Sequence, residues 1–422
     1  MRKNTSGSII NPEENITRHP LDEIVRRGAK KMLAEALEIE VESFVERYQY
    51  VLDDQGRRLV TRNGYSPERK IITGAGQLEV RTPRVDDRVL EGFKERRFGS
   101  SLIPRYLRRT KNMDELIPVL YLKGISTGDF TEALEKLLGK EVIGFSAEQI
   151  VRLKQCWQTE YETWHKRDLS GQKYVYFWVD GVYFNVRLED DRQCILVIIA
   201  AKEDGTKVLL AVEDGFRESK ESWRSIIRDL KRRGLVFAPK LAMGDGALGF
   251  WAAAEEEYPL TKHQLCWVHK TANVLDKLPK SLQPKAKTMI HDIYMAPTKM
   301  DANIAFDVFI EEFEDKYPKA VASLRENREN LMAFYDFPAE HWIHLRTTNP
   351  IESTFATVRL RTKRTKGCGS RMATLTMVFK LVLSAEKRWR ILRGDGKIRE
   401  VLDGVLFKDG QAVKNAPEAV KI

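Results

Sequence analysis

The segment Lys173-Tyr-Val-Tyr-Phe-Trp-Val-Asp180 is an apolar run that closes on a single carboxylate. A second apolar run, Lys240-Leu-Ala-Met-Gly-Asp245, closes in the same way. Short apolar runs bounded by turn residues are typical of buried strands. We therefore expect two core strands whose ends present Asp180 and Asp245.

The residues after Asp180 predict two further strands. Apolar runs cover Tyr183–Leu188 and Gln193–Ala201, and the turn signals Asp180-Gly181 and Glu189-Asp-Asp-Arg192 separate the runs. Closely spaced strands joined by short turns form antiparallel hairpins. We expect a three-stranded antiparallel meander at 173–180, 183–188 and 193–201.

The elements that follow extend this meander into an α/β domain. An amphipathic helix is expected at Ser219–Arg232, and a strand after it leads to Asp245. A second helix is expected at about Leu248–Glu256, and a short strand at Gln264–Cys266. Three strands, helix, strand, helix, strand is the element order of the ribonuclease H fold. In such a sheet the first and fourth strands are parallel neighbours, so Asp180 and Asp245 would leave it at the same end.

A third carboxylate, Glu352, opens a basic helix in the segment Thr347-Thr-Asn-Pro-Ile-Glu352-Ser. Asn349 suits the N-cap, Pro350 the first helical position and Glu352 the third. The strand pattern ends near residue 270, and residues 281–340 have the pattern of helices, which predicts an all-helical insertion before Glu352. A helix packed beside the sheet could bring Glu352 to the two aspartates.

Each carboxylate also has a structural interpretation. Asp180 could belong to a hairpin turn, Asp245 could cap a helix, and Glu352 could complete a capping box. Together, however, two strand-end aspartates and a helix glutamate form the set with which ribonuclease-H-like nucleotidyl transferases hold two divalent ions. Mg²⁺ prefers such hard oxygen ligands and keeps several waters. We expect two Mg²⁺ ions, with Mn²⁺ able to substitute.

The helix of Glu352 is rich in basic residues. They are Arg359, Arg361, Lys363, Arg364 and Lys366. Arg359 lies two helical turns after Glu352 and shares its face. A cation there could hold a phosphate of DNA beside the metal ions. The alternative is a basic helix that faces solvent.

The N-terminal part of the chain has a different pattern. A flexible tail at 1–20 precedes a region at 21–104, which contains a helix up to about Tyr48 and a basic β-hairpin around Gly74-Ala-Gly76. Capping boxes at Ser126-Thr-Gly-Asp129 and Ser146-Ala-Glu-Gln149 suggest a helix-turn-helix-like DNA-binding region at 105–170. The first part of the core is expected at 171–272 and the helical insertion at 273–344. The last part of the core is expected at 345–395, and a C-terminal tail at 396–422.

The composition limits the class of partner. The chain of 422 residues carries a formal net charge of +10, which favours a polyanionic partner, with nucleic acid the first candidate. Its 4 cysteines are scattered, which fits a reducing compartment. No apolar run is long enough to span a bilayer, and the N-terminus lacks the pattern of a signal peptide. We expect a cytoplasmic protein that associates with the nucleoid when bound to DNA.

The segment Cys266-Trp-Val-His269 has the spacing of half a metal site. Zinc needs further ligands, and the chain offers no second such pair, so zinc is disfavoured. Cys266 and His269 are expected in the core or around the site. The sequence also lacks a Walker A loop and a GxSxG motif.

Several motifs occur together and in order. They are Ser126-Thr-Gly-Asp-Phe130, Trp178-Val-Asp-Gly-Val-Tyr-Phe184, Gly244-Asp-Gly246, Cys266-Trp-Val-His-Lys-Thr-Ala-Asn273 and Thr348-Asn-Pro-Ile-Glu-Ser353. From about Leu21 to Trp389 the chain resembles the Mutator family of bacterial insertion-sequence transposases. The resemblance implies a DDE transposase with a ribonuclease-H-like core and a helical insertion. It assigns Asp180, Asp245 and Glu352 to the acidic positions, Cys266 and His269 to the Cys-two-His pair, and Arg359 to the basic residue after the glutamate.

These observations together lead to a functional hypothesis. The protein would bind the terminal inverted repeats of its own mobile element and would catalyse metal-dependent strand cleavage and strand transfer into target DNA. Because two element ends must be paired, we expect at least a dimer on DNA. Two alternatives stay open: a metal-dependent nuclease of the same fold, and a non-catalytic DNA-binding repressor.

Overall fold

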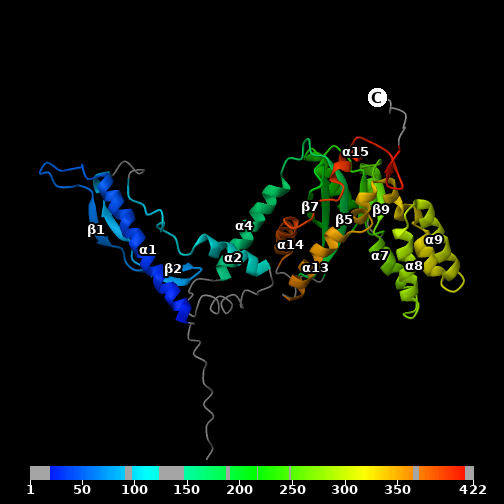
Figure 1. Ribbon diagram of the computed structural model, residues 1–422, viewed down its shortest axis with the longest axis horizontal. Coiled ribbons are helices and arrows are strands. Elements are labelled where there is room, and N and C mark those ends of the chain that lie inside the picture. The colour runs from blue at the N-terminus through cyan, green and yellow to red at the C-terminus, as the bar shows by residue number, and fades with distance from the viewer. Residues whose placement is uncertain are drawn as a thin grey trace, which may run out of the picture. The chain divides into compact units, whose positions relative to one another are not determined.

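The computed structural model describes residues 20–90, 97–122, 147–186, 191–215, 217–246, 249–364 and 370–413. The chain divides into two compact units, Met1–Ile150 and Val151–Ile422, and several elements of each are labelled in Figure 1. Helix α4 (Ala147–His165) contains the residue at which the units divide. Among the described residues, none of the helices has the length and apolar character needed to cross a membrane.

The first unit is built around the long helix α1 (Pro20–Arg47) and two antiparallel strand pairs. Strands β2 (Arg69–Thr73) and β3 (Gly76–Val80) form the predicted hairpin. Strands β1 (Thr61–Tyr65) and β4 (Pro83–Asp86) form a second pair, which was not predicted. A small core joins the helix to the hairpin through Leu37, Ile71, Leu78, Val80 and Ile103.

The rest of the first unit contains a 3-10 turn, η1 (Arg88–Leu90), and helix α2 (Lys111–Leu122). The first capping box, Ser126-Thr-Gly-Asp129, lies outside the described residues, and of the second only Ala147 onward is described, as the start of α4. The helix-turn-helix therefore stays a prediction. Of the predicted tail, residues 1–19 also lie outside the described part, and Pro20 already belongs to α1.

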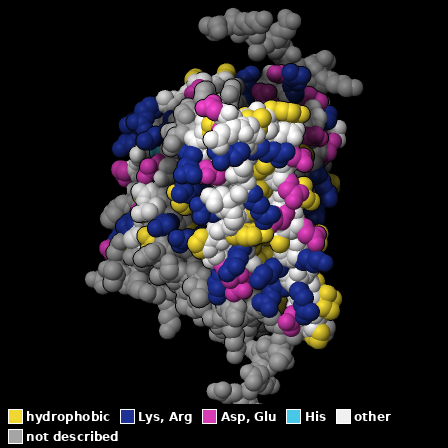
Figure 2. Space-filling view, turned by 90° about the vertical axis from the view of Figure 1, so that its left-hand side faces the viewer, with side chains coloured by type: hydrophobic (Ala, Val, Ile, Leu, Met, Phe, Trp, Pro, Cys, Tyr) yellow, Lys and Arg dark blue, Asp and Glu magenta, His cyan; other side chains and the backbone are white. Residues whose placement is uncertain are grey.

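Basic side chains are frequent on the surface. On the face shown in Figure 2, Lys and Arg side chains are interspersed with acidic and hydrophobic ones. In the first unit several of them are paired locally, for example Arg62 with Glu38 at 2.8 Å. A cleft of about 870 Å³ next to β4 is lined by four arginines, Arg69, Arg84, Arg97 and Arg105. Positive charge in the first unit is thus both distributed and gathered at one cleft.

The second unit contains a mixed five-stranded sheet with the order β7-β6-β5-β8-β9. Strands β5 (Tyr174–Phe184), β6 (Gln193–Lys202) and β7 (Lys207–Gly215) run antiparallel. Strands β8 (Leu241–Gly244) and β9 (Lys262–Leu265) continue the sheet in parallel with β5. The predicted parallel pairing of the two aspartate-bearing strands is confirmed.

The predicted three-stranded meander was wrong in detail. The run at 173–180 and the start of the run at 183–188 form one strand, β5, which ends at Phe184 and in which Asp180 pairs with Val197 and Gly181 with Leu196. The third run is β6, and the strand β7 was not predicted. Asp-Gly is a turn signal only where the backbone must reverse. Here β6 supplies hydrogen-bonding partners on both sides of the pair, so the strand continues.

Helical elements pack on both faces of the sheet. Helix α5 (Lys220–Arg232) buries Trp223, Ile226, Ile227 and Leu230, and helix α6 (Phe250–Glu257) buries Phe250 against the same core. Phe177 and Val179 of β5 belong to that core, so the residues that alternate with them face the other side. On that other side the Trp178 indole donates to the His344 carbonyl, and the Tyr176 hydroxyl bonds to His341.

A helical region connects β9 to the two long helices α13 (Asn349–Arg364) and α14 (Arg371–Glu386), which pack on the sheet. From Trp267 to Leu345, a stretch that the structure describes completely, there are helices and 3-10 turns but no strand. They are α7 (Trp267–Leu275), α8 (Gln283–Met295), α9 (Lys299–Phe313), α10 (Pro318–Arg325), α11 (Arg328–Leu331), η3 (Ala333–Asp336), η4 (Ala339–His341) and α12 (Trp342–Leu345).

The predicted C-terminal tail at 396–422 was wrong as far as residue 413. The chain there forms η5 (Asp395–Lys397), α15 (Ile398–Leu402) and a hairpin of β10 (Phe407–Lys408) with β11 (Gln411–Ala412). Ile398, Val401 and Phe407 are buried, and the Gly410 amide donates to the Tyr335 carbonyl at 3.2 Å. These few apolar residues lack a clear period, so only their tertiary contacts reveal the fold.

We predict that Ile398→Ala lowers the free energy of unfolding by about 2–4 kcal/mol, because it leaves a cavity at a fully buried position. Leu406→Ala is the control, since Leu406 is 60% exposed. Urea denaturation of the full chain measures both variants. Equal stability of the two variants would contradict the packing described for this segment.

Candidate active site

Asp180 and Asp245 lie level with each other on neighbouring parallel strands. Trp178 pairs with Met243, an offset of 65 residues, and Asp180 and Asp245 are 65 residues apart as well. Asp245 directly follows β8, whose last residue is Gly244. Residues at equivalent positions of paired strands point to the same face. The strand register therefore brings these two carboxylates to one edge and one side of the sheet.

The Asp180 carboxylate is buried without a salt bridge to any described residue. Asp180 is only 7% exposed, and one oxygen of its side chain accepts the Gly181 N–H at 2.9 Å. The pKa of Asp180 is raised to about 6, mainly by burial and in smaller part by the nearby Asp245, while His269, the Gly181 N–H and Arg359 oppose the rise. A carboxylate of this kind costs folding energy unless a cation joins it.

Helix α13 positions the third carboxylate. Ile351, Phe355 and Val358 are buried along one stripe of this helix, which packs against β5 and α14. Glu352 follows Ile351 and is half-buried in the first turn. Its backbone N–H donates to the Thr348 carbonyl at 3.1 Å. The apolar stripe thus fixes the side from which Glu352 approaches the sheet.

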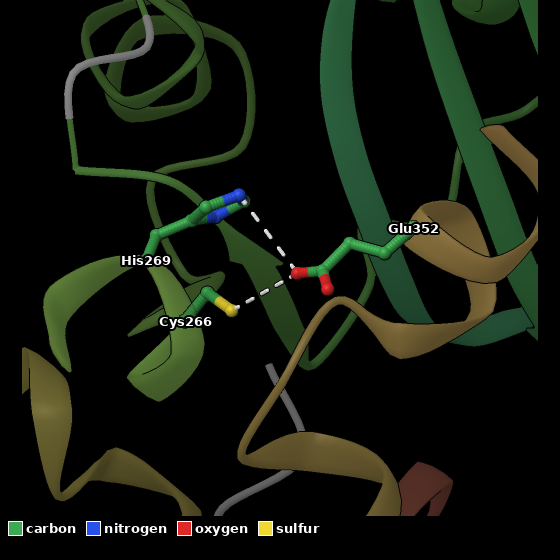
Figure 3. Close-up of side chains that lie close together, drawn as sticks. All are labelled: Cys266, His269 and Glu352. Carbon is green, nitrogen blue, oxygen red and sulfur yellow. Dashed lines mark hydrogen bonds and ion pairs between the residues drawn. The ribbon is translucent and has the colours of Figure 1, made fainter. Parts of the chain in front are cut away.

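Cys266 and His269 both face the Glu352 carboxylate, as Figure 3 shows. Glu352 Oε1 lies 3.8 Å from Cys266 Sγ and 3.8 Å from His269 Nε2. Cys266 is the residue before α7, and His269 lies in its first turn. The three side chains offer ligand atoms that lie within 4.8 Å of one another. The Cys-two-His pair is therefore part of the surroundings of the third carboxylate.

Thr348 completes this group. Its hydroxyl lies 2.8 Å from Glu352 Oε1 and 3.3 Å from Cys266 Sγ, and its amide donates to the same sulfur at 3.3 Å. Thr348 is fully buried, and Cys266 is 1% exposed. These contacts tie the start of α13 to the start of α7. Sequence reasoning placed Thr348 only in a motif and assigned it no role.

His269 links the two parts of the site. It contacts Cys266 and Glu352 on one side and interacts electrostatically with Asp180 and Asp245 on the other. The pKa of His269 is raised to about 9, first by its hydrogen bond to Cys266 and then by electrostatic interactions with Cys266, Asp245 and Asp180, while burial opposes the rise. His269 is consequently protonated at neutral pH and places a positive charge among the carboxylates.

Of the predicted DNA-contact residues, the structure places one. Arg359 is exposed on α13 and interacts electrostatically with Asp180, while the face that it is expected to share with Glu352 stays a prediction. Arg361, Lys363 and Arg364 lie in α13, but their side chains are outside the described part, as is the whole of Lys366. Their contacts with DNA stay predictions.

Sequence reasoning missed a fourth carboxylate, Glu218, which immediately precedes the N-cap Ser219 of α5. The pKa of Glu218 is raised to about 7, mainly by burial and also by Asp180 and Asp245, while His269 opposes the rise. The available signal was an acidic residue between a strand and a helix at the same end of the sheet as Asp245. Because β7 was not predicted, Glu218 could not be assigned to a strand end.

The carboxylates and the Cys266–His269 pair offer ligand atoms that suit different metal ions. Asp180, Asp245 and Glu218 offer only carboxylate oxygens, which Mg²⁺ and Mn²⁺ prefer. Cys266 and His269 offer sulfur and nitrogen, which suit softer metals, but both are engaged with Glu352 and Thr348. The arrangement can therefore hold hard divalent cations at the aspartates, with Glu352 held next to them by its own hydrogen bonds.

Comparison with known proteins gives a consistent match. The family model described as "Transposase, Mutator family" matches residues 2–391. The transposase for insertion sequence element IS6120 of Mycolicibacterium smegmatis is 52% identical over 302 residues, which cover 72% of this chain and 93% of that protein. The transposase for insertion sequence element IST2 of Acidithiobacillus ferrooxidans is 51% identical over 286 residues, which cover 66% of this chain and 94% of that protein.

We predict that Asp180→Asn stabilises the metal-free protein at pH 7. A carboxyl pKa raised from 3.8 to about 6 costs the folded state roughly 1–3 kcal/mol at that pH, since each pKa unit is about 1.4 kcal/mol. The folded state binds the Asp180 proton more tightly than the unfolded state, so the penalty is present above pH 6 and is lost as the pH falls toward 4. Thermal denaturation in EDTA across this range measures it.

The control for this prediction is Asp292→Asn, since Asp292 is exposed on α8. The stability gain of Asp180→Asn should shrink between pH 7 and pH 5, whereas the control should behave as the unmodified protein at every pH. A pH-independent or absent gain would mean that the Asp180 carboxylate is solvated.

Proposed function

The chain belongs to the Mutator family of transposases, and on this premise we propose that it cleaves and joins DNA through a DDE mechanism at Asp180, Asp245 and Glu352. The observation that carries the proposal is the strand register that sets Asp180 level with Asp245 at the edge of the sheet. Two neighbouring carboxylates, one of them in a buried residue, suit the binding of divalent ions.

We further infer that the five-stranded sheet is a ribonuclease-H-like core. Three antiparallel strands are followed by a helix, a parallel strand, a second helix and a last parallel strand, with the order β7-β6-β5-β8-β9. This order and these directions support the assignment. The helices between β9 and α13 would then be an insertion into that core, and α13 would be the helix that returns the third carboxylate.

Mg²⁺, with Mn²⁺ as a substitute, is the cofactor that this donor set fits. The surroundings of Asp180 fit such an ion. Asp180 is 7% exposed, and its one hydrogen bond to a described residue comes from its neighbour, Gly181. Asp180, Asp245 and Glu352 would hold two ions. When bound, such ions supply Lewis-acid stabilisation of the attacking and leaving oxygens in phosphoryl transfer.

The protein's own residues have distinct parts in this proposal. Asp180 and Asp245 form a rigid pair because the sheet fixes their backbones, whereas Glu352 is oriented by Thr348 and Cys266. Arg359, exposed beside Asp180, would hold a phosphate of the DNA strand. His269 would balance negative charge between the aspartates and Glu352.

The first unit supports recognition of DNA ends. Its arginine-lined cleft next to β4 and the exposed Arg58 and Arg81 offer cations for phosphate contacts. We propose that this unit binds the terminal inverted repeats of the element, in the cytoplasm, and that at least two copies of the chain pair two element ends. The sequence of the repeats would be read in the grooves of the DNA.

The first experiment tests cleavage directly. The full chain is incubated with a labelled duplex that carries the element's own end, with and without Mg²⁺. We predict nicking at the element boundary and joining of the 3′ end, both lost in Asp180→Asn while binding is retained. Asp292→Asn should cleave normally. Cleavage by Asp180→Asn would reject the proposed site, nicking without joining would indicate a nuclease, and binding alone would indicate a repressor.

A second prediction concerns the contact that orients Glu352. Thr348→Val keeps the shape of this buried residue but removes the hydroxyl next to Glu352 Oε1. We expect cleavage to fall by roughly 10- to 100-fold, the usual cost of losing a group that orients a metal-binding side chain. Thr348→Ser, which keeps the hydroxyl, should retain most of the activity. Equal rates for the two variants would show that the hydroxyl does not act through Glu352.

A further inference from the structure

Glu218 is held in place by the backbone around it. Its carbonyl accepts the Gly249 N–H at 3.0 Å, and its backbone bonds to the Tyr183 hydroxyl. A Cβ on Gly249 would collide with the backbone at Glu218 and Ser219, lying 2.6 Å from the Glu218 carbonyl oxygen. Glu218 is therefore fixed between β5 and the start of α6, even though it lies in a loop.

The Glu218 side chain lies against the backbone of β5 next to Asp180. A Cβ built on Gly181 would overlap this side chain and would lie 2.6 Å from its Cδ. Gly181 has no positive φ that would require glycine, and in the middle of a strand glycine weakens the sheet. The close approach of Glu218 is thus the physical reason for a glycine at this position.

Helix capping does not explain Glu218. The N-cap of α5 is Ser219, whose hydroxyl accepts the Ser222 N–H at 3.2 Å. The acidic residue of the first turn is Glu221, which is exposed and can interact with the helix dipole in water. Glu218 precedes the cap and lies against Gly181 instead.

The charge around Glu218 is unbalanced. Glu218 is half-buried, makes no ion pair with any described residue, and interacts electrostatically with Asp180 and Asp245. Partial burial of three carboxylates near one another is unfavourable, because like charges repel and each loses water. His269 is a nearby cation, yet it is also shared with Glu352. A divalent cation would balance this charge.

We propose that Glu218 is a fourth carboxylate of the cation site, where it binds a divalent ion directly or through its waters beside Asp180 and Asp245, and that Gly181 leaves the space for it. This inference rests on the proposed function of Asp180 and Asp245. It adds a ligand from the segment before α5, whereas Glu352 comes from the first turn of α13.

The test measures ion binding rather than activity. Mn²⁺ binding to the purified full chain without DNA is followed by electron paramagnetic resonance and by calorimetry for the unmodified protein, Glu218→Gln, Gly181→Ala and Asp180→Asn. Glu221→Gln, three residues further on, is the matched control. Thermal denaturation in EDTA checks that each variant is folded, and removal of a half-buried unpaired charge should not lower stability.

We expect Glu218→Gln to weaken Mn²⁺ binding by about 10-fold or more, a cost typical of a lost group in a metal site. Gly181→Ala should have a similar effect, because its methyl group displaces the flexible end of Glu218. Glu221→Gln should bind as the unmodified protein does. The Mg²⁺ concentration needed for half-maximal DNA cleavage should rise in Glu218→Gln and Gly181→Ala alone.

The outcomes separate this inference from the function on which it rests. If Glu218→Gln binds Mn²⁺ normally while Asp180→Asn does not, Glu218 is outside the site and the proposed function stands. If Gly181→Ala weakens binding and Glu218→Gln does not, the effect of Gly181 comes from the strand backbone, and the inference is overturned. If Asp180→Asn also binds normally, the cation site itself is wrong.

Discussion

The parallel pairing of β5 with β8 is the constraint on which the site depends. It sets one register between two strands that are far apart along the chain, and this register makes Asp180 and Asp245 neighbours. Sheet register is held by buried side chains on both faces, since a slip of one residue would move every side chain to the other face. The core around Phe177, Val179, Trp223 and Phe250 therefore fixes the spacing of the two carboxylates as firmly as it fixes the fold.

Around this pair the protein keeps charges that do not favour folding. Asp180 and Glu218 both have raised pKa values, for which burial is the main cause. Groups that destabilise the folded state are retained where a functional site needs them, and favourable packing elsewhere in the molecule offsets their cost. The core that β5 and β6 share with α5 and α6 is a large cluster of buried apolar side chains, and its stability can offset a small group of buried carboxylates next to it.

The third carboxylate has a different kind of support. Glu352 is not fixed by a strand but by the start of α13, and Thr348, Cys266 and His269 contact its carboxylate. These contacts join two helices that are about 80 residues apart in the chain. The pair Cys266 and His269 accordingly has a structural explanation that requires no zinc: it helps to orient Glu352, and His269 places a positive charge between Glu352 and the aspartates.

Local patterns were enough to identify the two apolar strands, the start of α13 near Asn349 and the basic hairpin of the first unit, because each depends on neighbours in sequence. They also placed Asp245 at the end of a strand and Glu352 at the start of a helix. They failed where long-range contacts decide: Asp180-Gly181 continues a strand because β6 pairs with it, and residues 396–413 fold because a few apolar side chains find a buried place. Glu218 and Thr348 carry no pattern of their own. Their importance comes from what folding brings beside them, Gly181 in one case and Glu352 in the other, and such proximity is a property of the tertiary structure alone.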